Sequence, residues 1–283
     1  MLVKNNWISS NIKHKLIDKK SLFKVKIKPY RFISNNFSEA VTEAILDIKK
    51  YDNLYLGLSG GIDSEFIARS FVKDKVNFTP IIGVSTFNKN EVKYAYAICK
   101  ELNIKPVIIY ISEQEMLNCF YDKIIKIFNG NGIHTIVNII LSKYVIKEKG
   151  IFVSGHNIIG GNKNNKSFVG IGEYEFYSDL VYNETFELPF FFYTPYLTFE
   201  MVKAIGYQNE LNTKYSLYST HVDRLFRKEK LEYSYEPSSL IFKFLLQYNK
   251  RYKTNVGLYI LDDQPKEFIL ESLLNFEKET EFC

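Results

Sequence analysis

The chain has 283 residues, of which 46% are hydrophobic and 24% charged, proportions typical of a globular protein with a buried core. Its apolar runs are far shorter than the roughly 18 to 20 residues that a membrane-spanning helix needs, and residues 1–10 lack the apolar core of a signal peptide. We therefore expect a cytoplasmic protein. The three cysteines are widely spaced and form no C-x-x-C pair, which excludes a disulfide framework and a four-cysteine zinc site.

The net charge of +5 is concentrated at the start of the chain. Residues 1–36 hold nine basic side chains and a single acid, Asp18. In residues 22–31 the lysines alternate with apolar residues, which predicts a half-buried strand with the lysine-rich outer face typical of an edge strand. A basic segment also suits the phosphates of a nucleic acid or of a charged small substrate, so tRNA stays open as a partner.

From Phe37 onward, short apolar runs alternate with stretches of helical periodicity. This alternation predicts an α/β fold, in which a mostly parallel sheet carries helices on both faces. The expected strands are 54–58, 80–84, 107–111 and 151–153. The expected helices follow apolar stripes in 37–48, 62–72, 92–102, 117–128 and 133–145.

The character of the chain changes near residue 160. Residues 160–166 are rich in glycine, asparagine and lysine, which indicates a mobile loop. Helical patterns at 240–248 and 268–276 each follow a proline. The expected domains are a basic N-terminal segment at 1–36, a core at 37–165 and an aromatic-rich, helical C-terminal substrate region at 166–283.

One short segment carries the clearest chemical signal. Between the first of these strands and its helix the sequence reads Leu58-Ser59-Gly60-Gly61-Ile62-Asp63-Ser64. The glycines allow a tight turn, the helix start offers free amides to an anion, and the serines add hydroxyl donors. Because Asp63 would repel a bare phosphate, an acid in this loop implies Mg²⁺ between the carboxylate and a polyphosphate.

Ser59-Gly60-Gly61-Ile62-Asp63-Ser64 resembles the S-G-G-x-D-S pyrophosphate loop, or PP-loop, of the N-type ATP pyrophosphatases, the adenine nucleotide alpha-hydrolase-like superfamily. The resemblance covers about residues 37–161 and is closest to the synthetase domain of asparagine synthetases. It implies a Rossmann-like sheet of the HUP type, with ATP and Mg²⁺ as cofactors. Members cleave ATP to AMP and pyrophosphate by adenylating a substrate oxygen, after which a nitrogen or sulfur nucleophile displaces AMP.

The motif and the resemblance together define the expected nucleotide site. Its phosphate-binding residues are Leu58, Ser59, Gly60, Gly61, Asp63 and Ser64, and Asp63 is also the expected Mg²⁺ ligand. The resemblance implies that the end of the second strand holds adenine through backbone groups, which here belong to Val84, Ser85 and Thr86.

Further candidates come from later in the chain. Gly155 and His156 follow the fourth expected strand at the edge of the sheet where such folds bind ligands. Lys214 and Arg224 are expected catalytic cations for the departing pyrophosphate, with a solvated helix face as the alternative. Glu91, in the first turn of a helix, could hold Mg²⁺, orient substrate or only complement the helix dipole. The scattered histidines His14, His134 and His221 are expected to be structural.

Departures from the asparagine synthetase pattern limit the expected function. The acidic Gly-x-Gly-x-Asp-Glu segment of that family is replaced by Ser154-Gly155-His156-Asn157. About 36 residues precede the core, too few for a glutaminase domain, so any nitrogen would come from free ammonia, an amine or a separate ammonia-supplying subunit. We expect an AMP-forming synthetase, amidotransferase-like, acting on a small molecule. The alternatives are a tRNA modifier similar to lysidine synthetases and a nucleotide-binding module without turnover.

Overall fold

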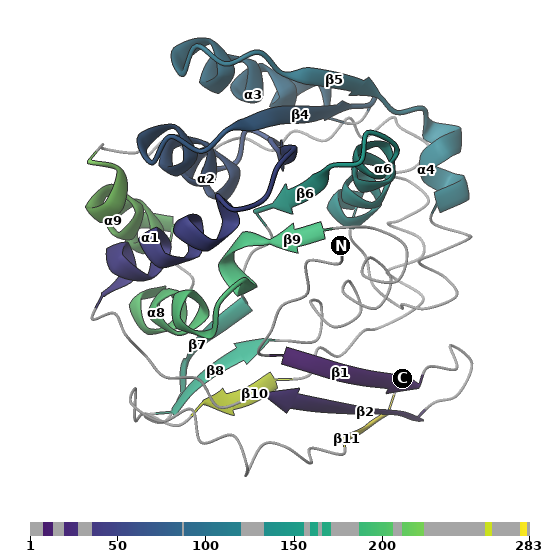
Figure 1. Ribbon diagram of the computed structural model, residues 1–283. Coiled ribbons are helices and arrows are strands. Elements are labelled where there is room, and N and C mark those ends of the chain that lie inside the picture. The colour runs from purple at the N-terminus through teal and green to yellow at the C-terminus, as the bar shows by residue number, and fades with distance from the viewer. Residues whose placement is uncertain are drawn as a thin grey trace.

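A five-stranded parallel sheet forms the centre of the computed structural model (Figure 1). The structure describes residues 8–13, 20–27, 36–86, 88–119, 133–155, 159–163, 166–170, 187–205, 211–223, 258–261 and 278–281. The sheet has the order β5-β4-β3-β6-β9, and every pairing in it is parallel. Its strands are β3 (Leu54–Gly57), β4 (Phe78–Val84), β5 (Val107–Tyr110), β6 (Ile151–Ser154) and β9 (Glu187–Pro189).

Helices cover both faces of this sheet, as the sequence predicts for an α/β fold. The helices are α1 (Phe37–Ile48), α2 (Ile62–Lys73), α3 (Lys89–Glu101), α4 (Glu113–Cys119), α6 (Ile133–Lys147), α8 (Pro195–Ile205) and α9 (Leu211–Val222), with a 3-10 turn η2 at Phe190–Phe192. In the described part of the chain, none of the helices combines the length and apolar character needed to cross a bilayer.

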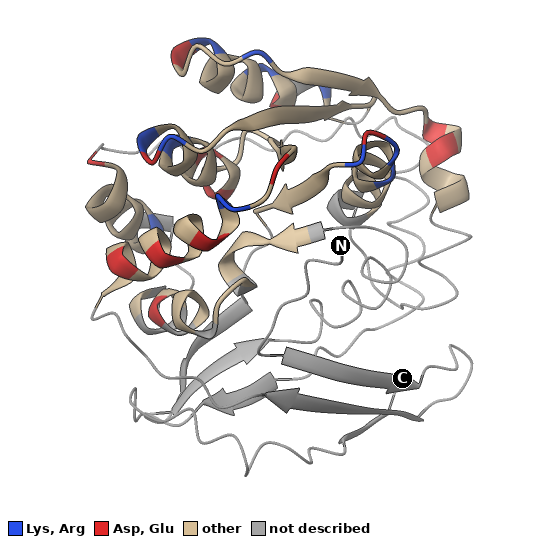
Figure 2. Ribbon diagram, viewed as in Figure 1, with Lys and Arg blue, Asp and Glu red and all other residues tan. Residues whose placement is uncertain are grey.

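Alternation along the strands divides the core into two hydrophobic clusters. Ile82 of β4 and Val153 of β6 pack with residues of α1, α2, α3, α8 and α9, whereas their neighbours Ile81 and Phe152 pack with residues of α4 and α6. Successive side chains of a strand point to opposite faces, so one strand can supply both clusters. Strands β3 to β6 contain no charged residue, and they are tan throughout in Figure 2, as strands buried on both faces require.

The order in which strands are added to the sheet reverses between β3 and β6. From β3 the chain moves to β4 and then to β5, and it later returns to place β6 on the other side of β3. In open α/β sheets, ligands bind beyond the carboxyl ends of the strands at such a reversal. The residues that follow β3 and β6 are therefore the candidates for a ligand-binding site.

The first of two smaller sheets contradicts the prediction of an edge strand near the start of the chain. The lysine-rich strand β2 (Lys20–Ile27) is central, because β1 (Ile8–Lys13) pairs on one side and β11 (Lys278–Glu281) on the other. The edge-strand prediction is wrong because alternation reveals a two-sided strand but not whether its hydrogen-bonding edges are paired.

The expected mobile loop at 160–166 is also wrong. β7 (Ile159–Lys163) pairs antiparallel with β8 (Lys166–Gly170), which pairs in turn with β10 (Leu258–Leu261). Backbone hydrogen bonds make these pairings whatever the side chains are, so a glycine-rich and asparagine-rich composition does not prevent them.

The four expected strands of the core and the helices 37–48, 62–72, 92–102 and 133–145 are confirmed to within a few residues. Of the stripe 117–128 only the beginning, in α4, is described. The helices expected at 240–248 and 268–276 lie outside the described residues. The central sheet and its core continue beyond residue 165 through β9, η2, α8 and α9, while the expected division into domains stays a prediction.

Candidate functional site

The turn after β3 requires glycine at one position. Gly60 has a φ of +89°, which side chains with a Cβ rarely adopt. A Cβ on Gly60 would lie 2.9 Å from the backbone nitrogen of Ala95 and 2.9 Å from Cβ of Tyr94, both in α3. The turn therefore packs closely against α3. Glycine is required at position 60 both by the positive φ and by the lack of room for a Cβ.

The turn leads directly into a helix start that no side chain caps. The N-cap residue of α2 is Gly61, which has no side chain to accept hydrogen bonds from the first turn. The amides of such a first turn carry partial positive charge and remain available to an anion or to water. Ser59 and Ser64 lie beside them, with their hydroxyl oxygens 3.2 Å apart, and Ser64 Oγ donates to the Gly61 carbonyl at 3.0 Å. The two hydroxyls and the amides of the first turn thus lie together at the start of α2, an arrangement that suits an anion.

Two candidates that are distant in the sequence meet at this helix start. Lys214 Nζ of α9 lies 3.1 Å from each carboxylate oxygen of Asp63, in the first turn of α2. The ammonium side chain is only 4% exposed, and that of Asp63 is 18% exposed. The structure therefore brings together the expected metal ligand and one expected catalytic cation.

Tyr218 of α9 is a third member of this group that the sequence reasoning did not identify. Its hydroxyl donates a hydrogen bond to Oδ1 of Asp63. Burial and the charge of Asp63 raise the pKa of Tyr218 well above its usual value, so the phenol stays protonated. One signal could have found it: Tyr218 follows Lys214 by four residues, a spacing that puts two side chains on one face of a helix.

The end of β6 lies against the same helix start. A Cβ on Gly155 would come 3.2 Å from the backbone nitrogen of Ser64 and 3.4 Å from the carbonyl carbon of Asp63. The preceding Ser154 is 2% exposed, and its hydroxyl has no hydrogen-bond partner among the described residues. The reversal point of the sheet is thus bounded by the β3 turn on one side and by the end of β6 on the other.

Val84, Ser85 and Thr86 lie at the end of the neighbouring strand β4, and several of their polar groups have partners. The Val84 carbonyl accepts from the amide of Ile111 at 2.8 Å, and the Ser85 amide donates to Asn88 Oδ1 at 2.8 Å. Thr86 Oγ1 donates to Glu113 Oε1 at 2.7 Å.

Glu91 places a buried carboxyl group on α3 close to the turn. Its side chain is 6% exposed, and Oε1 has no partner among the described residues. Its backbone oxygen lies 3.2 Å from the position that a Gly60 Cβ would take. Burial raises the pKa of Glu91 to about 7, so its charge changes near neutral pH.

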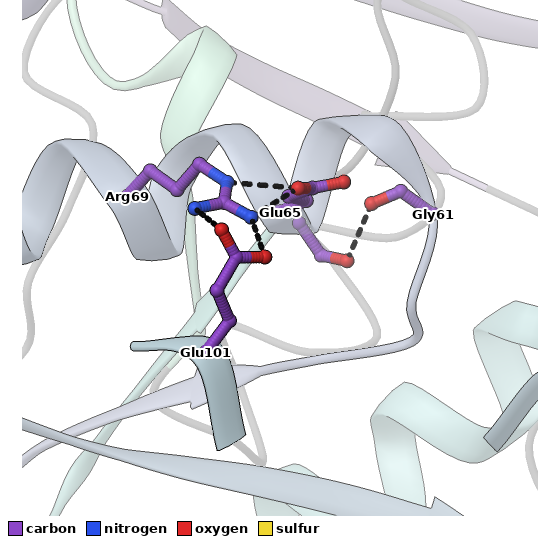
Figure 3. A network of polar contacts seen from close by, with 5 residues as sticks. Gly61, Glu65, Arg69 and Glu101 are labelled. Atoms are coloured by element: carbon purple, nitrogen blue, oxygen red, sulfur yellow. Dashed lines mark hydrogen bonds and ion pairs between the residues drawn. The ribbon is translucent and has the colours of Figure 1, made fainter. Parts of the chain in front are cut away.

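An ion cluster fastens α2 to α3 beneath the turn (Figure 3). Arg69 of α2 is 5% exposed; its Nη2 lies 2.7 Å from Glu65 Oε1 of the same helix and 2.9 Å from Glu101 Oε2 at the end of α3. One turn nearer the helix start, the amide of Glu65 donates to the Gly61 carbonyl at 2.9 Å. Both helices that contact the turn are therefore held to each other.

The remaining candidates lie away from this group or outside the described residues. His221 Nδ1 lies 3.0 Å from Ser38 Oγ, and its Nε2 is 3.6 Å from Asp74 Oδ2, so His221 bridges α1, α2 and α9. Burial lowers the pKa of this histidine, which is 1% exposed. His156 and Arg224 lie outside the described residues, so their expected roles stay predictions.

Comparison with known proteins gives a distant likeness. No protein-family model matches the chain, and no curated protein matches it. Among solved structures it is similar to NMN synthetase from Francisella tularensis, with 15% identity, a TM-score of 0.37, and coverage of 77% of this chain and 94% of that one. It is also similar to the NH3-dependent NAD synthetase from Campylobacter jejuni in complex with nitrate, with 16% identity, a TM-score of 0.31, and coverage of 76% and 93%.

Proposed function

We propose that the chain is an ATP-dependent, AMP-forming synthetase of the ATP pyrophosphatase kind, with its site at the turn after β3. One observation carries this proposal: Asp63 and the buried Lys214 meet at an uncapped helix N-terminus where the strand order reverses. An uncapped N-terminus binds phosphate, and a reversal of strand order is where such sheets bind nucleotides.

The residues of the turn suit a polyphosphate. The first-turn amides of α2 would donate hydrogen bonds to phosphate oxygens. The hydroxyls of Ser59 and Ser64 would rotate to do the same, which releases the bond from Ser64 Oγ to the Gly61 carbonyl. Lys214 neutralises Asp63 across 3.1 Å, which reduces the repulsion between this carboxylate and an approaching anion. The end of β4, at Val84 to Thr86, is our proposed location for the adenine.

Asp63 fits Mg²⁺ brought in with the nucleotide. Mg²⁺ is held by one or two protein carboxylates together with substrate phosphates, and Asp63 supplies a carboxylate in the first turn of α2. When bound, the ion would neutralise charge on the phosphates. The described residues contain no group of three or more His, Cys, Asp or Glu side chains able to hold a metal.

In the proposed reaction, a substrate oxygen attacks the α-phosphorus of ATP in line with the departing pyrophosphate. A bond forms between that oxygen and the phosphorus, while the bond from the α-phosphorus to the bridging oxygen breaks. The chain contributes positioning and positive charge, supplied by the helix amides and Lys214. A nitrogen nucleophile, either free ammonia or ammonia from a separate subunit, would then displace AMP.

Product analysis tests the proposal. The purified chain is incubated with Mg-ATP and either a mixture of amino acids with ammonia or bulk tRNA, and AMP, ADP and pyrophosphate are resolved. We expect AMP and pyrophosphate in equal amounts, a large loss of both in Asp63→Ala, and wild-type rates in Asp52→Ala, which removes an exposed acid outside the site. ADP and phosphate as products, or equal rates in the two variants, would contradict the proposal.

The basic start of the chain favours a second candidate, a tRNA-modifying ATP pyrophosphatase. Nine basic side chains lie in residues 1–36, and Lys24 and Lys26 alternate with apolar residues along β2. Binding through phosphates weakens steeply with salt. Binding of bulk tRNA should therefore fall between low and physiological salt, with a shallower slope once Lys24, Lys26 and Lys28 are replaced by glutamine. Stimulation of AMP formation by tRNA alone would select this candidate.

A further inference from the structure

We propose that Tyr218 is a positioning residue, which fixes the carboxylate of Asp63 in the orientation that receives a divalent cation accompanying a nucleotide. This inference rests on the proposed function and adds to it a residue from the second half of the chain. It assigns to α9 a part in metal binding as well as in packing.

The ring of Tyr218 is held by aromatic neighbours from three other elements. It stacks on Phe66 of α2 with ring centroids 4.1 Å apart, on Phe191 of η2 at 5.9 Å and on Phe37 of α1 at 6.0 Å. Tyr218 has no exposed surface. A close-packed interior leaves such a ring little freedom to move, so the position of its hydroxyl is set by the core of the protein.

The fixed hydroxyl determines where Asp63 points. The side chains of Tyr218 and Lys214 both contact Asp63. The phenol oxygen of Tyr218 belongs to a rigid aromatic ring, whereas Lys214 Nζ ends a flexible stem of four carbons. The hydroxyl of Tyr218 donates its hydrogen bond to Oδ1 of Asp63 and so fixes the plane of the carboxylate. Lys214 Nζ lies 3.1 Å from Oδ2, so a cation that binds this oxygen displaces the flexible ammonium and leaves the bond from Tyr218 in place.

Residues that orient a metal ligand without touching the metal commonly affect metal affinity by 10-fold to 100-fold. Replacing Tyr218 by phenylalanine keeps the ring and its stacks and removes only the hydroxyl. We expect Tyr218→Phe to weaken divalent-cation binding in the nucleotide complex by about 10-fold or more. A residue that acted only through packing would lower the melting temperature without changing this affinity.

The test uses the full chain with a non-hydrolysable ATP analogue and Mn²⁺, and free Mn²⁺ is measured by electron paramagnetic resonance. The matched control is Tyr215→Phe, because Tyr215 is on the same helix and is 7% exposed, and among the described residues its hydroxyl makes no hydrogen bond with Asp63. Weakened Mn²⁺ binding in Tyr218→Phe but not in Tyr215→Phe supports the inference. Equal Mn²⁺ affinity in Tyr218→Phe and the wild type overturns it.

Two further results separate the inference from the proposed function. If the wild-type chain binds neither the analogue nor Mn²⁺, the proposed function itself fails, and the positioning role fails with it. If Tyr218→Phe does not fold, Phe191→Leu takes its place, since it removes one stacking ring and leaves the hydroxyl in the protein. Weaker Mn²⁺ binding in folded Phe191→Leu supports the positioning role, and unchanged binding overturns it.

Discussion

Gly155 packs directly on the backbone of Ser64, so the end of β6 and the start of α2 are separated by no side chain. A methyl group at position 155 would lie 3.2 Å from the Ser64 nitrogen, which is tighter than most contacts of a real Cβ. Because Ser64 carries one of the two hydroxyls beside the helix start, this contact joins two chain segments that are far apart in the sequence at the place where we propose that phosphate binds.

Gly155→Ala should weaken nucleotide binding as well as lower stability. The added methyl must displace the first turn of α2 by a few tenths of an ångström, which disturbs the amides that we propose as phosphate donors. We expect an ATP dissociation constant raised several-fold with a free energy of unfolding lowered by about 1 kcal/mol, measured by calorimetry and urea unfolding. Unchanged ATP affinity in a folded variant would argue against a phosphate site here.

Gly60→Ala should destabilise the fold itself. The residue would have to hold a φ of +89°, and its Cβ would meet the backbone nitrogen of Ala95 at 2.9 Å. A strained backbone conformation of this kind costs about 1 to 3 kcal/mol, so we expect a loss within or above that range in urea unfolding. Ser59→Ala, in the same turn but at an exposed position, is the control and should cost less than about 0.5 kcal/mol.

Asp63 and Lys214 should be energetically coupled. A double-mutant cycle with Asp63→Asn and Lys214→Met isolates the interaction that the two side chains make across 3.1 Å. Residues within one ion-pair network show coupling of about 0.5 to 3 kcal/mol, and the low exposure of Lys214 places this pair in the upper part of that range. Additive effects of the two substitutions on urea unfolding would contradict the contact.

Arg69→Met should destabilise the protein more than Glu101→Gln does. Arg69 is 5% exposed and contacts two acids, so Arg69→Met removes both ion pairs. Glu101→Gln removes only the pair with an acid that is 46% exposed, and Glu65 still pairs with Arg69. Hydrogen bonds to charged groups contribute about 1.5 to 3 kcal/mol when buried, and exposed ion pairs contribute less than about 1 kcal/mol. Thermal melts of the two variants at one pH check the order, and the reverse order would show that the cluster of Figure 3 does not fasten α2 to α3.

Glu91 should make the protein less stable as the pH rises. Its pKa is about 7 in the folded chain, against 4.5 for an ordinary glutamate, so the folded state retains a proton that the unfolded state releases. The contribution of this group is full below pH 4.5 and is lost as the pH rises through 7, a change of about 3 kcal/mol. Glu91→Gln should therefore stabilise the chain relative to the wild type at pH 8 but not at pH 4.5.

Urea unfolding at both pH values measures this difference. The control is Glu148→Gln, which alters an exposed glutamate in the turn after α6. A Glu91→Gln variant with the same pH dependence as the wild type would show that this carboxyl group is not desolvated.

The sequence by itself determined the core of the fold and the turn after β3. Strands β3 to β6 follow from short, continuous apolar runs, which burial on both faces requires, and the helices between them follow from hydrophobic periodicity. The turn was recognisable because its requirements are also local: a positive φ at Gly60 and free amides at the start of α2. The strand spacing and the order of residues were enough to predict where an anion could bind.

Only the tertiary structure decided which side chains share the site. Lys214 and Tyr218 lie 151 and 155 residues beyond Asp63, and their contacts depend on how α9 packs against α2. The spacing of four residues from Lys214 places Tyr218 on the same helix face, but that spacing does not indicate that Asp63 is its partner. The pairing of β2 on both of its edges and of β7 with β8 was hidden for the same reason, because backbone hydrogen bonds between distant segments leave little mark on the residues that make them.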